Sequence, residues 1–247
     1  MKDVILRTNA IPVYGFLSLI NARLPQGETL HQKKILDCGA GGRVPPLALF
    51  DQHGFEAWGI DTSDGQLDRA RQFCDERGLQ VHLRKGDMRC IPFEDEAFDY
   101  AYEHYSLCHL CKRDTALAVS EMYRVVKRRG LCFLGVISAD SWPKSLFGRE
   151  RDPGEYWIEE DGNEPALHSL FTDEEADELI SAWEVVSKEK RIGYLREEAE
   201  KVSLEAWMAL YKEAGDRCSR EVWRARYARR ANEFQYTHFY FFLRKPG

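Results

Sequence analysis

The segment KKILDCGAGGRVPPLALF, residues 33–50, constrains the fold more than any other part of the sequence. Its apolar run KILDC is typical of a short buried strand, and the two prolines after the glycines suit the first turn of a helix, where a missing N–H costs nothing. Gly39 and Gly41 would let a ligand approach the backbone closely. The segment therefore predicts a strand, a ligand-binding turn and a helix whose free N–H groups face that ligand.

Strand and helix patterns alternate along the first half of the chain. Strands are expected at residues 34–38, 55–61, 81–87, 97–104, 131–138, 184–192 and 236–243. Ser63 predicts the start of a helix that Gly78 stops. Asp114 is expected to cap another helix, with residues 127–129 in its last turn and Gly130 at its end. This alternation predicts an α/β fold whose mainly parallel sheet carries helices on both faces.

Composition limits the classes of function. The chain has 247 residues, 44% of them apolar, and a formal net charge of −6, which makes nucleic acid an unlikely partner because phosphate binding needs a basic surface. Arginines between residues 217 and 230 would lie on opposite sides of a helix, so a solvated helix is favoured over a phosphate-binding stripe. The apolar run at residues 10–20 is too short and interrupted to span a membrane, and its flanks do not suit a signal peptide.

The seven cysteines are odd in number and show no disulfide framework. They are therefore expected to be reduced thiols, which indicates a cytoplasmic protein. Cys108 and Cys111 form a single C-x-x-C pair. A zinc site would need a second such pair or a histidine pair at short spacing, and the sequence has neither, so no metal site is predicted.

The ligand of the glycine turn can be narrowed from its neighbours. Asp61 lies twenty residues after Gly41 at the end of the second strand, where a carboxylate can bind both ribose hydroxyls. A dinucleotide turn would need a third glycine at position 44, which is Val44. Asp37 would repel a diphosphate but attract an amino group. These features favour a ligand with a ribose, an amino group and no phosphate, such as S-adenosylmethionine, over a nicotinamide cofactor.

Four motifs then resemble those of class I S-adenosylmethionine-dependent methyltransferases. They are LDCGAGG, WGIDTSDGQLDRAR, GDMRCIPFEDEAFD and EMYRVVKRRGLCFLGVIS, in family order and spacing over residues 30–140. The first motif departs from D-x-G-x-G-x-G because Arg43 replaces the third glycine, with Gly42 beside it. The resemblance implies a Rossmann-like, seven-stranded, mostly parallel sheet with helices on both faces and an antiparallel last strand.

The resemblance also implies the residues that bind the cofactor. Asp61 would bind the ribose and Gln66 would lie near the adenine, while Asp87 would bind the adenine amino group and Met88 would offer a backbone N–H. Glu103 is expected to border the methionine end of the cofactor. The full predicted set is Asp37, Gly39, Ala40, Gly41, Asp61, Thr62, Gln66, Asp87, Met88 and Glu103.

In this family the methyl acceptor faces the segment after the fourth strand, here residues 102–110. His104 is the candidate general base, whereas His109 is expected to be a packing residue. The segment carries no motif for a flipped nucleobase amine. We therefore expect a methyltransferase for a small-molecule acceptor, the alternatives being an RNA or protein methyltransferase, or a non-catalytic S-adenosylmethionine-binding protein.

One domain over residues 1–247 is expected. Residues 1–30 would form an N-terminal helical lid, by resemblance to family members that have one. Residues 139–171, which show no clear period, and residues 195–233 would form insertions that cover the substrate. The tryptophan at position 207 is expected to be ordinary core rather than a pocket wall.

Overall fold

The computed structural model describes residues 4, 6, 10–31, 33–158, 165–213, 219–230 and 233–247. The elements of the first half are α1 (Ile11–Arg23), β1 (Lys34–Cys38), α2 (Leu47–Gln52), β2 (Glu56–Asp61), α3 (Asp64–Asp75), β3 (His82–Lys85), β4 (Phe98–Tyr102), the short 3₁₀ helix η2 (Leu107–His109), α4 (Lys112–Val125) and β5 (Val126–Ser138). Helix α2 begins directly after the two prolines, and the Ser63 hydroxyl caps α3 by accepting from the Gln66 N–H. The strand–turn–helix unit at residues 33–50 is thus confirmed.

The second half contains further strands and short helices. They are the 3₁₀ helix η3 (Lys144–Phe147), β6 (Arg149–Asp152), β7 (Glu155–Ile158), β8 (Ala166–Phe171), α5 (Asp173–Leu179), β9 (Glu184–Tyr194), α6 (Arg196–Lys201), α7 (Leu204–Glu213), α8 (Arg220–Tyr227) and β10 (Gln235–Arg244). Helix α5 opens on a complete capping box between Thr172 and Glu175, which fixes its start.

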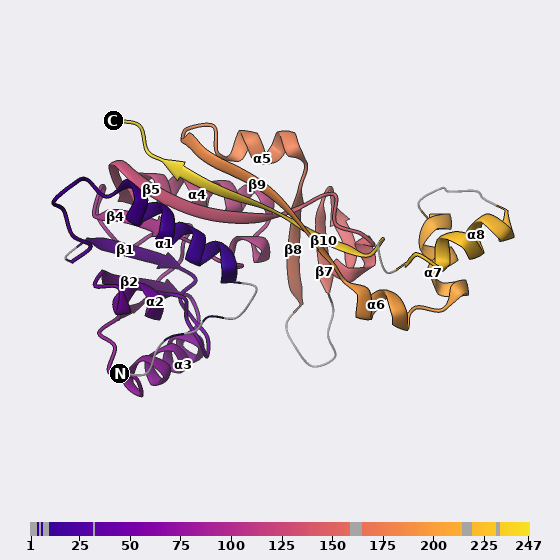
Figure 1. The fold of residues 1–247 in the computed structure, drawn as a ribbon, viewed down its shortest axis with the longest axis horizontal. Helices are drawn as coiled ribbons and strands as arrows, with labels where there is room; N and C mark the ends of the chain where they lie inside the picture. Colours follow the sequence, from indigo (N-terminus) through magenta and orange to yellow (C-terminus); the bar gives the residue numbers. More distant parts are fainter. Residues whose placement is uncertain are drawn as a thin grey trace.

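The central sheet has the predicted topology. Strands β3, β2, β1, β4 and β5 pair in that order and run parallel. Strand β10 pairs antiparallel with β5 on one side and with β9 on the other. These seven strands confirm the mostly parallel sheet with an antiparallel last strand (Figure 1).

Helices cover both faces of this sheet. On one face α1, α2 and α3 pack against one set of strand side chains, including Phe133 of β5 and Tyr240 of β10. On the other face α4 and α5 pack against the alternate set, including Leu134 and Phe239. Because successive side chains of a strand point to opposite faces, both cores need apolar residues at every position of the central strands.

Two sequence predictions about α4 are wrong. The helix starts at Lys112 with Cys111 in the N-cap position, because the carboxylate of Asp114 pairs with Arg89 instead of capping a helix. The helix ends at Val125, and residues 127–129 lie at an irregularity of β5. Gly130 is needed there for close packing: a Cβ atom would lie 2.6 Å from the Asp99 carbonyl oxygen.

Residues 139–171 contain three strands that the sequence pattern does not reveal. Strands β6, β7 and β8 pair antiparallel in order, and β8 joins the main sheet by pairing parallel with the end of β5. Every residue of β6 is exposed, so this strand carries no apolar alternation from which it could be recognised. These strands extend the sheet beyond the carboxyl end of β4.

Helices α6, α7 and α8 form a separate aromatic cluster at the far end of the long β9 and β10 strands, away from α2 and α3 (Figure 1). Trp207 is fully buried in it, as expected of a core residue. Arg226 stacks on the rings of this cluster and Arg230 donates to the Ala199 carbonyl, so these two side chains pack inward and only part of the arginine-rich segment is solvated. Arg217 lies outside the described residues. Within the described ranges, no helix is long and apolar enough to cross a membrane.

Candidate active site

The glycine turn after β1 is fixed to the end of β2 by backbone hydrogen bonds. The N–H groups of Gly39 and Ala40 both donate to the Ile60 carbonyl, at 2.8 and 2.9 Å. The Gly41 N–H donates to Asp61 Oδ2 at 3.1 Å, and the Gly42 N–H donates to the Gln66 carbonyl. The turn is therefore held in one shape by the strand and helix beside it.

Steric crowding explains the glycines of this turn. A Cβ atom on Gly39 would lie 1.9 Å from Ser106 Oγ, and one on Gly41 would lie 2.4 Å from Asp61 Oδ2. Gly39 and Gly42 also have φ angles of 108° and 109°, a region that side-chain-bearing residues avoid. Gly42 thus supplies a left-handed residue directly before Arg43, and Arg43 itself is exposed.

A cavity of about 300 Å³ opens beside this turn at the carboxyl ends of β1 and β2. Its lining includes five of the predicted cofactor residues: Gly39, Asp61, Thr62, Asp87 and Met88. Ile60, Gly86, Arg89, Ser106, His109 and Leu110 complete the lining. Three of the four motifs therefore meet at one cavity, of a size at the lower end of the range for small-molecule sites.

Asp61 keeps hydrogen-bonding capacity for a ligand in this cavity. Its Oδ2 accepts from the Gly41 N–H and its Oδ1 accepts from the Ser63 N–H at 2.8 Å. A carboxylate offers about four acceptor positions, so about two remain. The same side chain that orders the turn and the start of α3 can thus accept two further hydrogen bonds, as two vicinal hydroxyls would require.

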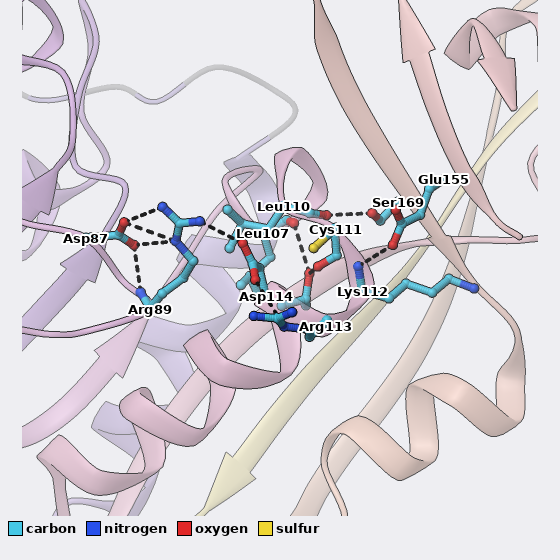
Figure 2. Close-up of polar contacts among 11 residues, drawn as sticks. Asp87, Arg89, Leu107, Leu110, Cys111, Lys112, Arg113, Asp114, Glu155 and Ser169 are labelled. Atoms are coloured by element: carbon cyan, nitrogen blue, oxygen red, sulfur yellow. Dashed lines mark hydrogen bonds and ion pairs between the residues drawn. The ribbon is translucent and has the colours of Figure 1, made fainter. Parts of the chain in front are cut away.

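Asp87 is occupied by Arg89 (Figure 2). Its two oxygens accept from Arg89 Nε and Nη2 at 2.6–3.0 Å, and Oδ1 also accepts from the Arg89 N–H. The hydrogen bonds from Arg89 lower the pKa of Asp87. Arg89 Nη1 bonds Asp114 at 2.7 Å, so a ligand amino group reaching Asp87 would compete with this ion pair. Sequence reasoning did not single out Arg89.

Asp37 is buried beneath the turn and points at Tyr102. Only 1% of Asp37 is exposed, and its Oδ2 accepts from the Tyr102 hydroxyl at 2.6 Å. Burial raises the pKa of Asp37 to about 7, against the opposing effect of the Tyr102 hydrogen bond. Asp37 therefore lies behind the turn, where its hydrogen bond joins β1 to β4.

Glu103 is also fully buried, at the end of β4. Its carboxylate accepts from three backbone N–H groups: Gly135 at 2.6 Å, Ser106 at 3.0 Å and Leu107 at 3.1 Å. Burial raises the pKa of Glu103 to about 7 although these bonds act in the opposite direction. In this geometry Glu103 fastens the loop after β4 to β5.

The two candidate histidines lie on different sides of that loop. His109 lines the cofactor cavity, and its Nδ1 lies 3.1 Å from the Leu167 carbonyl of β8. His104 does not line this cavity and packs edge-on against Tyr105. The role of His104 as a base stays a prediction. His109 instead holds the loop to strand β8. This contact could not be predicted, because the sequence pattern does not reveal β8.

Two more bonds join the same loop to the added strands. Ser169 Oγ donates to the Leu110 carbonyl at 2.5 Å, and the Lys112 N–H donates to Glu155 Oε1 at 2.7 Å (Figure 2). The loop that borders the cavity is therefore braced on one side by Arg89 and Asp114 and on the other by β7 and β8.

Other features of the chain do not compete for the cofactor. A larger cavity of about 580 Å³ lies at the opposite ends of the strands, near Lys33, Asp99 and Arg129. Its lining contains none of the predicted cofactor residues. The six cysteines of the described chain are free thiols, with Cys108 buried and Cys111 at the start of α4. Within the same ranges, no group of three or more His, Cys, Asp or Glu side chains is arranged to hold a metal ion.

The part of the chain that contains this cavity matches a known family. Residues 36–134 match the family model described as "Methyltransferase domain". The sterol 24-C-methyltransferase of Pneumocystis carinii is 32% identical over 128 residues, which cover 50% of this chain and 32% of that protein. The matched part thus spans about a third of the length of this curated relative.

Solved structures share the fold at low identity. A SAM-dependent methyltransferase from Methanosarcina mazei aligns over 92% of this chain and 97% of its own, with a TM-score of 0.64 and 17% identity. A Burkholderia thailandensis 1,6-didemethyltoxoflavin-N1-methyltransferase, solved with S-adenosylhomocysteine, aligns over 97% and 79%, with a TM-score of 0.58 and 13% identity. Residues 36–134 therefore match a methyltransferase-domain family model, and the chain as a whole shares its fold with these solved methyltransferase structures.

Proposed function

We propose that the protein transfers a methyl group from S-adenosylmethionine to a small-molecule acceptor. The observation that carries this proposal is the meeting of Gly39, Asp61 and Asp87 at one cavity, beside a turn that leaves no room for a side chain at Gly39 or Gly41. The sterol and toxoflavin methyltransferases named above act on small molecules, which supports the acceptor class.

The residues present fit the cofactor. Asp61 retains acceptor positions for the ribose hydroxyls, and Gly86 and Met88 offer backbone and apolar surface for the adenine. Asp87 would meet the adenine amino group once Arg89 shares its carboxylate. When bound, S-adenosylmethionine supplies an electrophilic methyl group. The chain then has to orient the acceptor in line and exclude water, which can provide much of the rate acceleration.

The segments that are expected to cover the substrate belong to the same proposal. The β8 backbone bonds His109 of the cavity, which supports residues 139–171 as a wall of the acceptor site. Helix α1 packs Phe16 against Phe133 and Phe242 on the sheet, and helices α6, α7 and α8 lie beyond the carboxyl ends of the parallel strands (Figure 1). We propose that residues 1–30 and 195–233 complete the enclosure when an acceptor binds.

Titration calorimetry with S-adenosylhomocysteine and with NADH tests the cofactor. We expect S-adenosylhomocysteine to bind and NADH to give no heat of binding; the reverse pattern would contradict the proposal. Asp61→Ala should weaken binding at least about tenfold, since a doubly bonded carboxylate contributes about 1.5–3 kcal/mol. Asp68→Ala is the matched control, because Asp68 is an exposed α3 carboxylate paired only with Arg71.

A screen of metabolites that detects S-adenosylhomocysteine production can identify the methyl acceptor. His104→Ala tests the base within that screen. Intact turnover in the variant would remove His104 from the chemistry, while a loss of turnover with unchanged S-adenosylhomocysteine binding would support the role. Turnover with RNA or protein and none with small molecules would overturn the acceptor class.

A further inference from the structure

A second, narrow space borders the β4 loop next to the cofactor cavity. Its lining is Glu103, His104, Tyr105, Cys108, Phe133, Gly135, His238 and Tyr240. Ser106, the next residue along the chain from Tyr105, lines the cofactor cavity instead. The two spaces therefore border the same loop, and the second one is too narrow to hold a water molecule.

His238 of β10 carries an unpaired polar atom in this space. The residue is only 5% exposed, and its Nε2 has no hydrogen-bond partner in the part of the chain that the structure describes. Burial, with a smaller contribution from His104, lowers the pKa of His238 to about 3, so the ring is neutral near pH 7. Native proteins rarely leave such an atom unpaired, and here no water can fill the role.

The walls around His238 are mainly aromatic, although the buried Glu103 belongs to the lining and Arg191 of β9 lies over the Tyr240 ring at 5.5 Å. Its ring stacks on Tyr240 with an interplanar angle of 8° at 5.5 Å between centroids, and meets the Tyr105 ring edge-on at 4.9 Å. Tyr236 packs on it from the other side along β10 at 4.5 Å. Burial raises the pKa of all three tyrosines. A planar ring with one polar group packs against such aromatic walls better than a branched aliphatic molecule does.

Tyr105 lies on one side of this space and its hydroxyl reaches across to Tyr240. Its φ angle is +61°, which is costly for a residue with a side chain. Its hydroxyl lies 3.1 Å from the Tyr240 hydroxyl across the space. The adjacent Glu103 and Ser106 are fastened by the buried carboxylate, so rotation at Tyr105 can open the space without moving the cofactor side of the loop.

We infer that His238 Nε2 is the hydrogen-bond partner of the methyl acceptor, that the acceptor is a small planar ring bearing an O–H or N–H group, and that Tyr105 is the cover that moves to admit it. This inference rests on the proposed function, because it takes the narrow space as the acceptor subsite next to the cofactor. It assigns a role to a β10 histidine that the sequence motifs do not mark.

Phenol and toluene are the probes, because they share a ring and differ in one hydroxyl. The full chain saturated with S-adenosylhomocysteine is titrated with each while the imidazole ¹⁵N resonances are followed by NMR. We expect phenol to shift the His238 Nε2 resonance, and toluene to leave that nitrogen unshifted. The ring of His82, stacked on Trp58 at the β3 edge of the sheet, serves as the internal control and should not respond.

Variants then separate the hydrogen bond from packing. His238→Phe keeps an aromatic ring but removes Nε2, and should weaken phenol binding at least about fivefold, whereas His82→Phe should bind phenol as the wild type does. Equal phenol affinity in His238→Phe and wild type, or a wild-type His238 resonance that phenol does not move, would overturn the inference. Failure of S-adenosylhomocysteine to bind would instead count against the proposed function, and the phenol titration of the chain alone would still test His238.

Discussion

Two pairs of carboxylates lie around the glycine turn and differ in what they contact. Asp61 and Asp87 line the cavity and are part-exposed, whereas Asp37 and Glu103 are buried and lie outside the cavity lining. All four follow strands of the parallel sheet and are expected from their motifs to serve the cofactor. The difference teaches that Asp61 offers the ligand free acceptor positions and Asp87 does so once Arg89 shares its carboxylate, while Asp37 and Glu103 hold the turn and the β4 loop in place.

The largest effect is expected from removing Glu103. Glu103→Ala leaves three buried N–H groups without an acceptor, and should lower the free energy of unfolding by about 3 kcal/mol or more, since each such group costs about 1–3 kcal/mol. Urea denaturation followed by circular dichroism measures this. Glu103→Gln keeps one acceptor oxygen, so its free energy of unfolding should lie between those of Glu103→Ala and the wild type. A change in Glu103→Ala below about 0.5 kcal/mol would show that the carboxylate does not fasten the loop.

Removing Asp87 should instead weaken cofactor binding while changing the free energy of unfolding little. Asp87→Ala is expected to weaken S-adenosylhomocysteine binding about five- to tenfold, because one hydrogen bond to the adenine amino group is worth about 1–1.5 kcal/mol. Its effect on unfolding should stay below about 1 kcal/mol, since its ion pair with Arg89 is part-exposed. Calorimetry and urea denaturation of one preparation give both numbers. Asp95→Ala, which removes another exposed arginine partner, is the control; a stability loss without an affinity loss would place Asp87 with the buried pair.

The buried pair should also make stability depend on pH. The pKa of Asp37 in the folded protein is about 7, while an unfolded aspartate titrates near 4. The folded state therefore holds more protons between these values, and this group's contribution to stability is lost as pH rises from about 4 to about 7. The free energy of unfolding of Asp37→Asn, taken relative to that of the wild type, should consequently be higher at pH 8 than at pH 5 by about 1 kcal/mol or more. A difference that is independent of pH, measured by urea denaturation at both values, would contradict the raised pKa.

The smallest effect is expected at Arg43, which occupies the position of the third family glycine. Its side chain is exposed, and it has no hydrogen bond or ion pair among the described residues. Arg43→Ala should change both unfolding and S-adenosylhomocysteine binding by no more than about 0.5 kcal/mol. A tenfold loss of affinity would mean that Arg43 contacts the cofactor and that the turn rearranges on binding.

The sequence was sufficient wherever local patterning determines structure. The strand–turn–helix at residues 33–50 and the cap at Ser63 follow from short apolar runs and from glycine and capping chemistry, whereas the antiparallel direction of β10 is implied by the family resemblance and not by its apolar pattern. Strand β6 could not be predicted because all its side chains are exposed. The separation of Glu103 from the cavity and the orphaned Nε2 of His238 depend on burial by distant strands, which no local pattern records.

A crystal structure of the complex with S-adenosylhomocysteine tests the division between the two pairs most directly. We predict that the ribose hydroxyls bond Asp61 Oδ1 and Oδ2, that the adenine lies along Gly86 and Met88, and that Glu103 keeps its three backbone partners. Ligand density at another cavity, or a ribose that bonds Glu103 while Asp61 remains unbound, would contradict the account.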